Sequence, residues 1–94
     1  MVNSYRARAE EPKYLEWVRI HAKAKDGYVA NFQRRTTVML HHAECKTLTA
    51  NRYCKTTPLY PKLCGFPTLR ELLAQVKKEW GTDTILECSK CWRH

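Results

Sequence analysis

The sequence predicts an α+β fold in which a small antiparallel meander packs on one helix. Residues 14–41 are rich in β-branched and aromatic residues, which favour strands. Residues 68–80 follow a helical period with a single apolar stripe. Close to its end the chain has a Cys-x-x-Cys pair, which can close such a fold around a metal ion.

The length of 94 residues predicts one domain, residues 14–94, preceded by a polar N-terminal arm, residues 1–13. Basic and acidic side chains alternate along the arm and Pro12 ends it, so a frayed terminus is expected. A chain this short buries a modest fraction of its surface. A bound metal would therefore add useful stability.

Three strands are expected to form the meander. Residues 14–22 alternate between two faces, but neither face is cleanly apolar, so a helix remains an alternative there. The dipeptide Asp26-Gly27 is a strong hairpin signal and predicts that residues 28–34 return as the second strand. Residues 36–41 are expected to follow as the third strand.

One helix is expected, over residues 68–80. Thr68 and Glu71 have the spacing of a capping box, and Gly81 supplies the left-handed residue that ends many helices. The preceding residues 46–65 have no clean period and are expected to form a long loop. The apolar stripe of the helix, which predicts its core face, comprises Leu69, Leu72, Leu73, Val76 and Trp80.

The five cysteines are expected to stay reduced. The N-terminus lacks the apolar run of a secretion signal, and no stretch approaches the length of a membrane span, so a cytoplasmic protein is expected. In that compartment a cysteine pattern favours a metal site over disulfides. A redox-active Cys-x-x-Cys normally opens a helix, whereas this one follows a short expected strand, which disfavours redox chemistry.

The metal ligands are expected to come from two parts of the chain. A short strand at residues 84–87 leads into Cys88 and Cys91, and the preferred partners are His41 and Cys45, where the third strand should end. Thiolates favour zinc, and four protein ligands leave no open position, so one structural Zn²⁺ in a zinc knuckle is predicted. The identity of the fourth ligand remains open among His41, His42, Cys54, Cys64 and His94.

The net charge of +8 favours a polyanionic partner, most simply nucleic acid. The excess is uneven, because residues 1–66 have 12 basic and 5 acidic side chains, whereas residues 67–94 have 5 and 4. Basic and aromatic residues are also interleaved within residues 46–65, as in loops that bind single-stranded nucleic acid. The candidate phosphate contacts are Arg19, Lys23, Lys25, Arg34, Arg35, Arg52, Lys55 and Lys62.

Part of the pattern resembles the N-terminal metal-binding domain of the Ada DNA-repair protein. The matching segments are Val38-Met39-Leu40-His41-x-x-x-Cys45, then Phe66-x-Thr68-Leu69-x-Glu71-Leu72-Leu73, then Leu86-x-Cys88-x-x-Cys91. The resemblance implies zinc binding and a surface that faces DNA. It does not extend to methyl transfer, because His41 stands where that family has the reactive cysteine.

The expected function is a non-enzymatic zinc-binding domain that contacts nucleic acid, most simply DNA, in a regulatory or accessory role. The alternative is a small protein-interaction module, or an inhibitor of a partner protein, in which an exposed Trp92 would be an anchor. An enzyme is disfavoured because no acidic side chain other than Glu44 lies near the His41-His42 pair. Neither a membrane nor a small-molecule substrate is expected.

Overall fold

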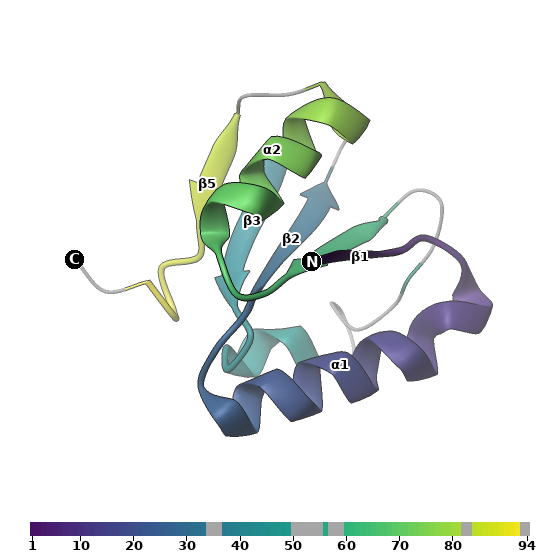
Figure 1. The fold of residues 1–94 in the computed structure, drawn as a ribbon, viewed down its shortest axis with the longest axis vertical. Coiled ribbons are helices and arrows are strands. Elements are labelled where there is room, and N and C mark those ends of the chain that lie inside the picture. Colours follow the sequence, from purple (N-terminus) through teal and green to yellow (C-terminus); the bar gives the residue numbers. More distant parts are fainter. Residues whose placement is uncertain (34–36, 50–55, 57–59, 82–83, 93–94) are drawn as a thin grey trace.

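The computed structural model describes residues 1–33, 37–49, 56, 60–81 and 84–92. Within these residues the chain forms a five-stranded sheet and two α-helices, which confirms the α+β class (Figure 1). The elements are β1 (Val2–Tyr5), η1 (Arg8–Glu10), α1 (Glu11–Ala24), β2 (Tyr28–Gln33), β3 (Thr37–His42), η2 (Lys46–Thr49), β4 (Lys62–Gly65), α2 (Leu69–Trp80) and β5 (Ile85–Glu87).

The strands are arranged in the order β1-β4-β2-β3-β5. The first three pairings are antiparallel, and β3 pairs with β5 in parallel. The predicted pairing of the second and third strands is confirmed, and its register places Val29 opposite His41. Because β5 runs parallel to β3, the C-terminal ends of both strands lie at the same end of the sheet. The candidate site lies beside these two C-terminal ends.

The two helices cover opposite faces of the sheet. Tyr14 and Trp17 of α1 pack in one cluster with Val29, whereas Leu72 of α2 packs in a second cluster with Ala30. Neighbouring residues of a strand point to opposite faces, so Val29 and Ala30 lie on different sides of the sheet. The chain is therefore a three-layer domain, and the layer under α1 contains the cysteines discussed below.

Helix α2 confirms the prediction of a helix capped by Thr68 and ended by Gly81. The Thr68 side chain accepts a hydrogen bond from the Glu71 amide at 3.3 Å, and Gly81 adopts φ 62°. Leu72 and Val76 are fully buried. The other predicted stripe residues, Leu69, Leu73 and Trp80, are half-buried against the same cluster.

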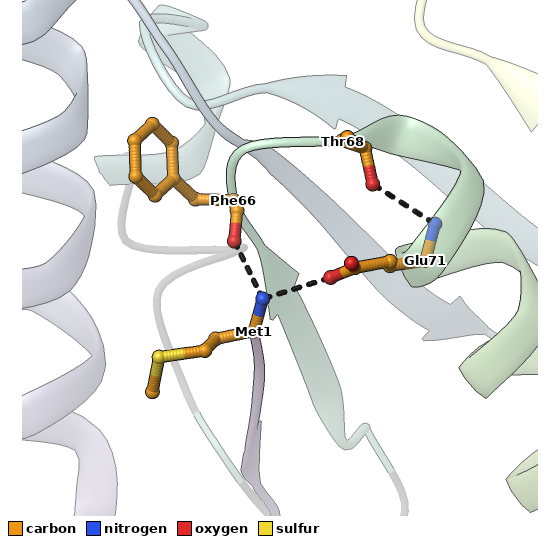
Figure 2. A network of polar contacts seen from close by, with 4 residues as sticks. All are labelled: Met1, Phe66, Thr68 and Glu71. Atoms are coloured by element: carbon orange, nitrogen blue, oxygen red, sulfur yellow. Dashed lines mark hydrogen bonds and ion pairs between the residues drawn. The ribbon is translucent and has the colours of Figure 1, made fainter.

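The Glu71 side chain binds the N-terminal ammonium group, whereas its backbone amide donates to Thr68 at the helix start. The Met1 nitrogen donates to the Glu71 carboxylate at 2.8 Å and to the Phe66 carbonyl oxygen at 2.7 Å (Figure 2). Both groups of this ion pair are more than half exposed, so it contributes little to stability. It does link the start of β1 to the first turn of α2.

The strand predicted for residues 14–22 is wrong, since these residues belong to α1. Their buried side chains, Tyr14, Trp17 and Val18, have the i, i+3, i+4 spacing of a helix face, which outweighs their β propensity. Pro12 lies in the first turn of this helix, where proline is tolerated. The expected hairpin turn is instead the C-terminal end of α1, with Lys25 in the left-handed conformation at φ 57°.

The polar arm and the long loop are also corrected, and for a shared reason. Residues 2–5 form β1, which pairs along its length with β4 from the segment predicted as a loop. Each strand has four residues, too few to show a clear period in the sequence. All four residues of β4 are buried, because it lies inside the sheet between β1 and β2.

Candidate metal centre

Four side chains from two distant parts of the chain converge beside the C-terminal ends of β3 and β5. The possible ligand atoms of His41, Cys45, Cys88 and Cys91 all lie within 4.8 Å of one another. The Cys45 and Cys88 sulfurs are 3.9 Å apart. The structure therefore brings together the same four residues that the sequence predicts as ligands.

The backbone explains how these side chains meet. His41 lies in β3, and Cys45 follows on a turn in which its amide donates to the His42 carbonyl oxygen at 2.9 Å. The parallel strand β5 delivers Cys88 beside them, and the Cys88 amide donates to the Leu40 carbonyl oxygen at 2.9 Å. The ladder thus continues for one bond beyond β5 and sets Cys88 next to the end of β3.

The Cys-x-x-Cys segment forms a tight turn that is closed by its own backbone and contacted by the His42 amide. The Cys91 and Trp92 amides donate to the Cys88 carbonyl oxygen at 3.2 Å and 2.9 Å. The His42 amide donates to the Cys91 sulfur at 3.4 Å. Amide N–H groups directed at sulfur stabilise thiolates, which are the form that binds metal.

The thiol pKa values reflect this environment. Burial opposes ionisation of Cys88, but the amides of Lys90 and Cys91 and the neighbouring thiols outweigh it, so its pKa is lowered. Burial, followed by the nearby Cys45 and Cys88, raises the pKa of Cys91 to about 12. Cys88 thus ionises more readily than Cys91, because thiolates so close together repel one another.

His41 has an imidazole suited to a ligand role. It is 3% exposed, and its Nε2 atom is buried without a hydrogen-bond partner in the described part of the chain. Burial, with a smaller contribution from the Lys62 charge, lowers the pKa of His41 to about 4. The ring is consequently neutral near pH 7, with a lone pair available.

Thr47 is a functional candidate that the sequence prediction missed. Its hydroxyl lies 3.4 Å from His41 Nδ1 and 3.0 Å from the Cys45 sulfur. A partner on the second ring nitrogen orients a ligating histidine and selects its tautomer. Threonine two residues after a cysteine has no distinctive sequence pattern, and only the turn into η2 brings it to the site.

The donor set and its spacing fit a tetrahedral ion. Metal–sulfur bonds of ~2.3 Å at the tetrahedral angle separate two sulfurs by about 3.8 Å. The Cys45–Cys88 sulfur separation of 3.9 Å matches this value. The unpartnered Nε2 of His41 is available as a nitrogen ligand. The group can therefore hold a structural metal ion.

The rival fourth ligands are separated from the site or lie outside the described residues. Cys64 is fully buried but is not part of the converging group, and burial raises its pKa well above the usual value, so it stays a protonated thiol. The His42 ring packs on Trp92, with ring centroids 4.0 Å apart. His21 lies on α1 and contacts Asp26 at 2.6 Å. Cys54 and His94 lie outside the described residues.

Trp92 is not the exposed anchor considered in the alternative function. Its indole N–H donates to the Leu40 carbonyl oxygen at 3.0 Å, and its ring packs on Tyr28 and His42. The side chain is half-buried. Trp92 therefore attaches the end of the knuckle to the sheet.

The candidate phosphate contacts fall into three groups. Arg19, Lys23 and Lys25 are exposed on or directly after α1, where Arg19 also pairs with Glu16. Lys62 is 1% exposed, so its place among the surface contacts is a wrong prediction; the inward face of β4 buries it. The remaining candidates, Arg34, Arg35, Arg52 and Lys55, lie outside the described residues.

Comparison with known proteins finds no matching family model, curated protein or solved structure. The resemblance to the Ada metal-binding domain thus remains a prediction from the pattern alone. In the described part of the chain, every helix is too short or too polar to cross a bilayer.

Proposed function

We propose that the chain is a non-enzymatic domain stabilised by one structural Zn²⁺, bound by His41, Cys45, Cys88 and Cys91. The convergence of these four ligand atoms within 4.8 Å is the observation that supports it. Three sulfurs and one imidazole nitrogen are the donors that zinc prefers among the common metals. Four protein ligands fill a tetrahedral shell, which favours a structural role over hydrolysis.

Elemental analysis of the protein, purified without added chelator, tests the metal proposal. We expect one zinc per chain, because a Cys₃His set binds zinc as a closed structural site. A folded protein that contains no transition metal, before and after incubation with zinc, would contradict the proposal.

The partner we propose is nucleic acid, bound in part by the outer face of α1. The buried face of this helix holds Tyr14, Trp17 and Val18, so Lys13, Arg19 and Lys23 point away from the core. Lys25 follows in an exposed position. These cations form a basic surface on the same side of the sheet as the metal centre, and such surfaces supply most of the non-specific affinity for nucleic acid.

A salt titration with a matched pair of variants tests this contact. The α1 variant combines Arg19→Gln, Lys23→Gln and Lys25→Asn, with asparagine chosen because it tolerates the left-handed conformation. On random duplex DNA, the negative slope of log affinity against log salt should become shallower by about 0.9 for each phosphate contact removed. Binding should weaken by a similar factor for all sequences.

The control removes three positive charges from α2, through Arg70→Gln, Lys77→Gln and Lys78→Gln. These residues are exposed as well, so the net charge falls equally in both variants. We expect the control to keep the wild-type slope. Equal losses in both variants would mean that α1 is not the contact surface. Salt-insensitive binding, or none, would favour the protein-interaction alternative instead.

A further inference from the structure

A charged side chain lies in the buried layer between the sheet and α1. Lys62 of β4 is 1% exposed. Its ammonium group donates to the Asn31 side-chain oxygen at 3.0 Å and to the Tyr60 carbonyl oxygen at 3.5 Å, and it lies 5.6 Å from the Tyr14 ring centroid. Burial of an ammonium group is expensive, and therefore a lysine in this position calls for a specific reason.

The sheet register places Lys62 on the same face as the metal centre. Lys62 pairs with Asn31 of β2, and Asn31 pairs on its other side with Met39 of β3. His41 lies two residues beyond Met39, and it therefore points to the same face. Tyr14, whose ring centroid lies 5.6 Å from the Lys62 ammonium group, packs in one core cluster with Cys45 and Cys88. The ammonium group and the ligands thus share the buried layer between the sheet and α1.

The net charge of the zinc-bound site decides whether the Lys62 ammonium group stabilises it or destabilises it. Zinc has two positive charges, three thiolates have three negative charges, and a neutral imidazole adds none, which leaves −1. Cys45 and Cys88 are less than a tenth exposed, so water screens this charge weakly. A nearby buried cation stabilises such an anionic centre, whereas it would not stabilise a neutral one.

We propose that Lys62 is the cation that balances the net negative charge of the zinc centre. This role of Lys62 rests on the zinc site proposed above. It replaces the phosphate contact that the sequence predicted for Lys62. Lys62 would favour a set of three thiolates and one histidine over a neutral set of two cysteines and two histidines. It would also stabilise metal-bound thiolates without being a ligand itself.

A double-mutant cycle on zinc affinity tests this role. Lys62→Met removes the charge and keeps most of the apolar stem, and Cys91→His converts the site to a neutral one at its least buried ligand. Chelator competition on the purified chain gives the zinc dissociation constant of each variant. Lys62→Met should weaken zinc binding about 10- to 100-fold in the wild-type site, the usual range for residues that support ligands. In the Cys91→His background the same change should have a much smaller effect.

The cycle separates charge balance from packing. If Lys62 only fills space, Lys62→Met will weaken zinc binding by the same factor in both backgrounds, and the proposal fails. Should Cys91→His not bind zinc, His41→Cys provides the opposite comparison, because its site has a charge of −2 and should depend more strongly on Lys62. If Lys62→Met does not fold, Lys62→Gln replaces it. A wild-type chain that binds no zinc would refute the metal site itself, a different result from an unaltered affinity in the Lys62 variant.

Discussion

Cys88→Ala is expected to remove the bound zinc and to unfold the domain at room temperature. Alanine cannot ligate a metal, and the three remaining ligands would have to recruit water. Structural zinc contributes about 10–16 kcal/mol of apparent binding free energy in zinc-finger peptides, where it is coupled to folding. Because small domains are stable by only ~5–15 kcal/mol, most of that margin should disappear. Zinc content and thermal unfolding followed by circular dichroism measure both effects.

Cys64→Ala is the matched control for this experiment. Cys64 is buried even more completely than Cys88 and belongs to the same core cluster, but it is not part of the converging group. Both variants lose one sulfur from the core, so the difference between them isolates the metal. Cys64→Ala should keep one zinc per chain and lose about 1 kcal/mol or slightly more, as is usual for a small buried truncation. Equal metal content and equal melting temperatures in the two variants would show that Cys88 is not a ligand.

Chelation of the wild-type protein should reproduce the effect of Cys88→Ala without any change in sequence. A strong chelator removes the ion, and the buried Nε2 of His41 then lacks a partner among the described residues. The melting temperature should fall with chelator and recover when zinc is added back. This reversal distinguishes the loss of the metal from oxidation of the thiols, which added zinc would not repair.

The convergence of His41, Cys45, Cys88 and Cys91 was predictable because metal coordination imposes strict spacing on a sequence. Cys88 and Cys91 must lie close together, and His41 and Cys45 must bend around a strand end, so both pairs are visible without knowledge of the fold. The meeting of the pairs depends on the parallel alignment of β5 with β3. That alignment is a long-range pairing, and no local pattern encodes it.

The missed elements show where local patterns are insufficient. Strands β1 and β4 are stabilised by each other and by β2, through partners far apart in the chain, so neither segment shows its structure by itself. Lys62 shows the same limit for a single residue. A lysine normally indicates an exposed position, and only the central place of β4 in the sheet explains its burial. In contrast, α2 was predictable because its cap and its apolar stripe are both local signals.

Trp17→Ala is the second change for which we expect a large effect. In the helix, Trp17 lies in the core with Tyr14 and Val18 and is 9% exposed. Its ring also contacts His21, with centroids 4.1 Å apart, and it lies against Gly27. Truncation of a buried tryptophan typically costs about 3–5 kcal/mol. Denaturant unfolding of the zinc-loaded protein should show a loss of this size.

Ile20→Ala provides the control that separates the helix from the strand expected for this segment. In a strand, Ile20 would share a face with Val18, and the two residues would be buried or exposed together. In α1, Val18 is 2% exposed and Ile20 is 49% exposed. Val18→Ala should therefore destabilise the protein clearly, whereas Ile20→Ala should change its stability by about 0.5 kcal/mol or less. Comparable losses from both would restore the strand for residues 14–22 and would remove the basic face of α1 on which the proposed nucleic-acid contact depends.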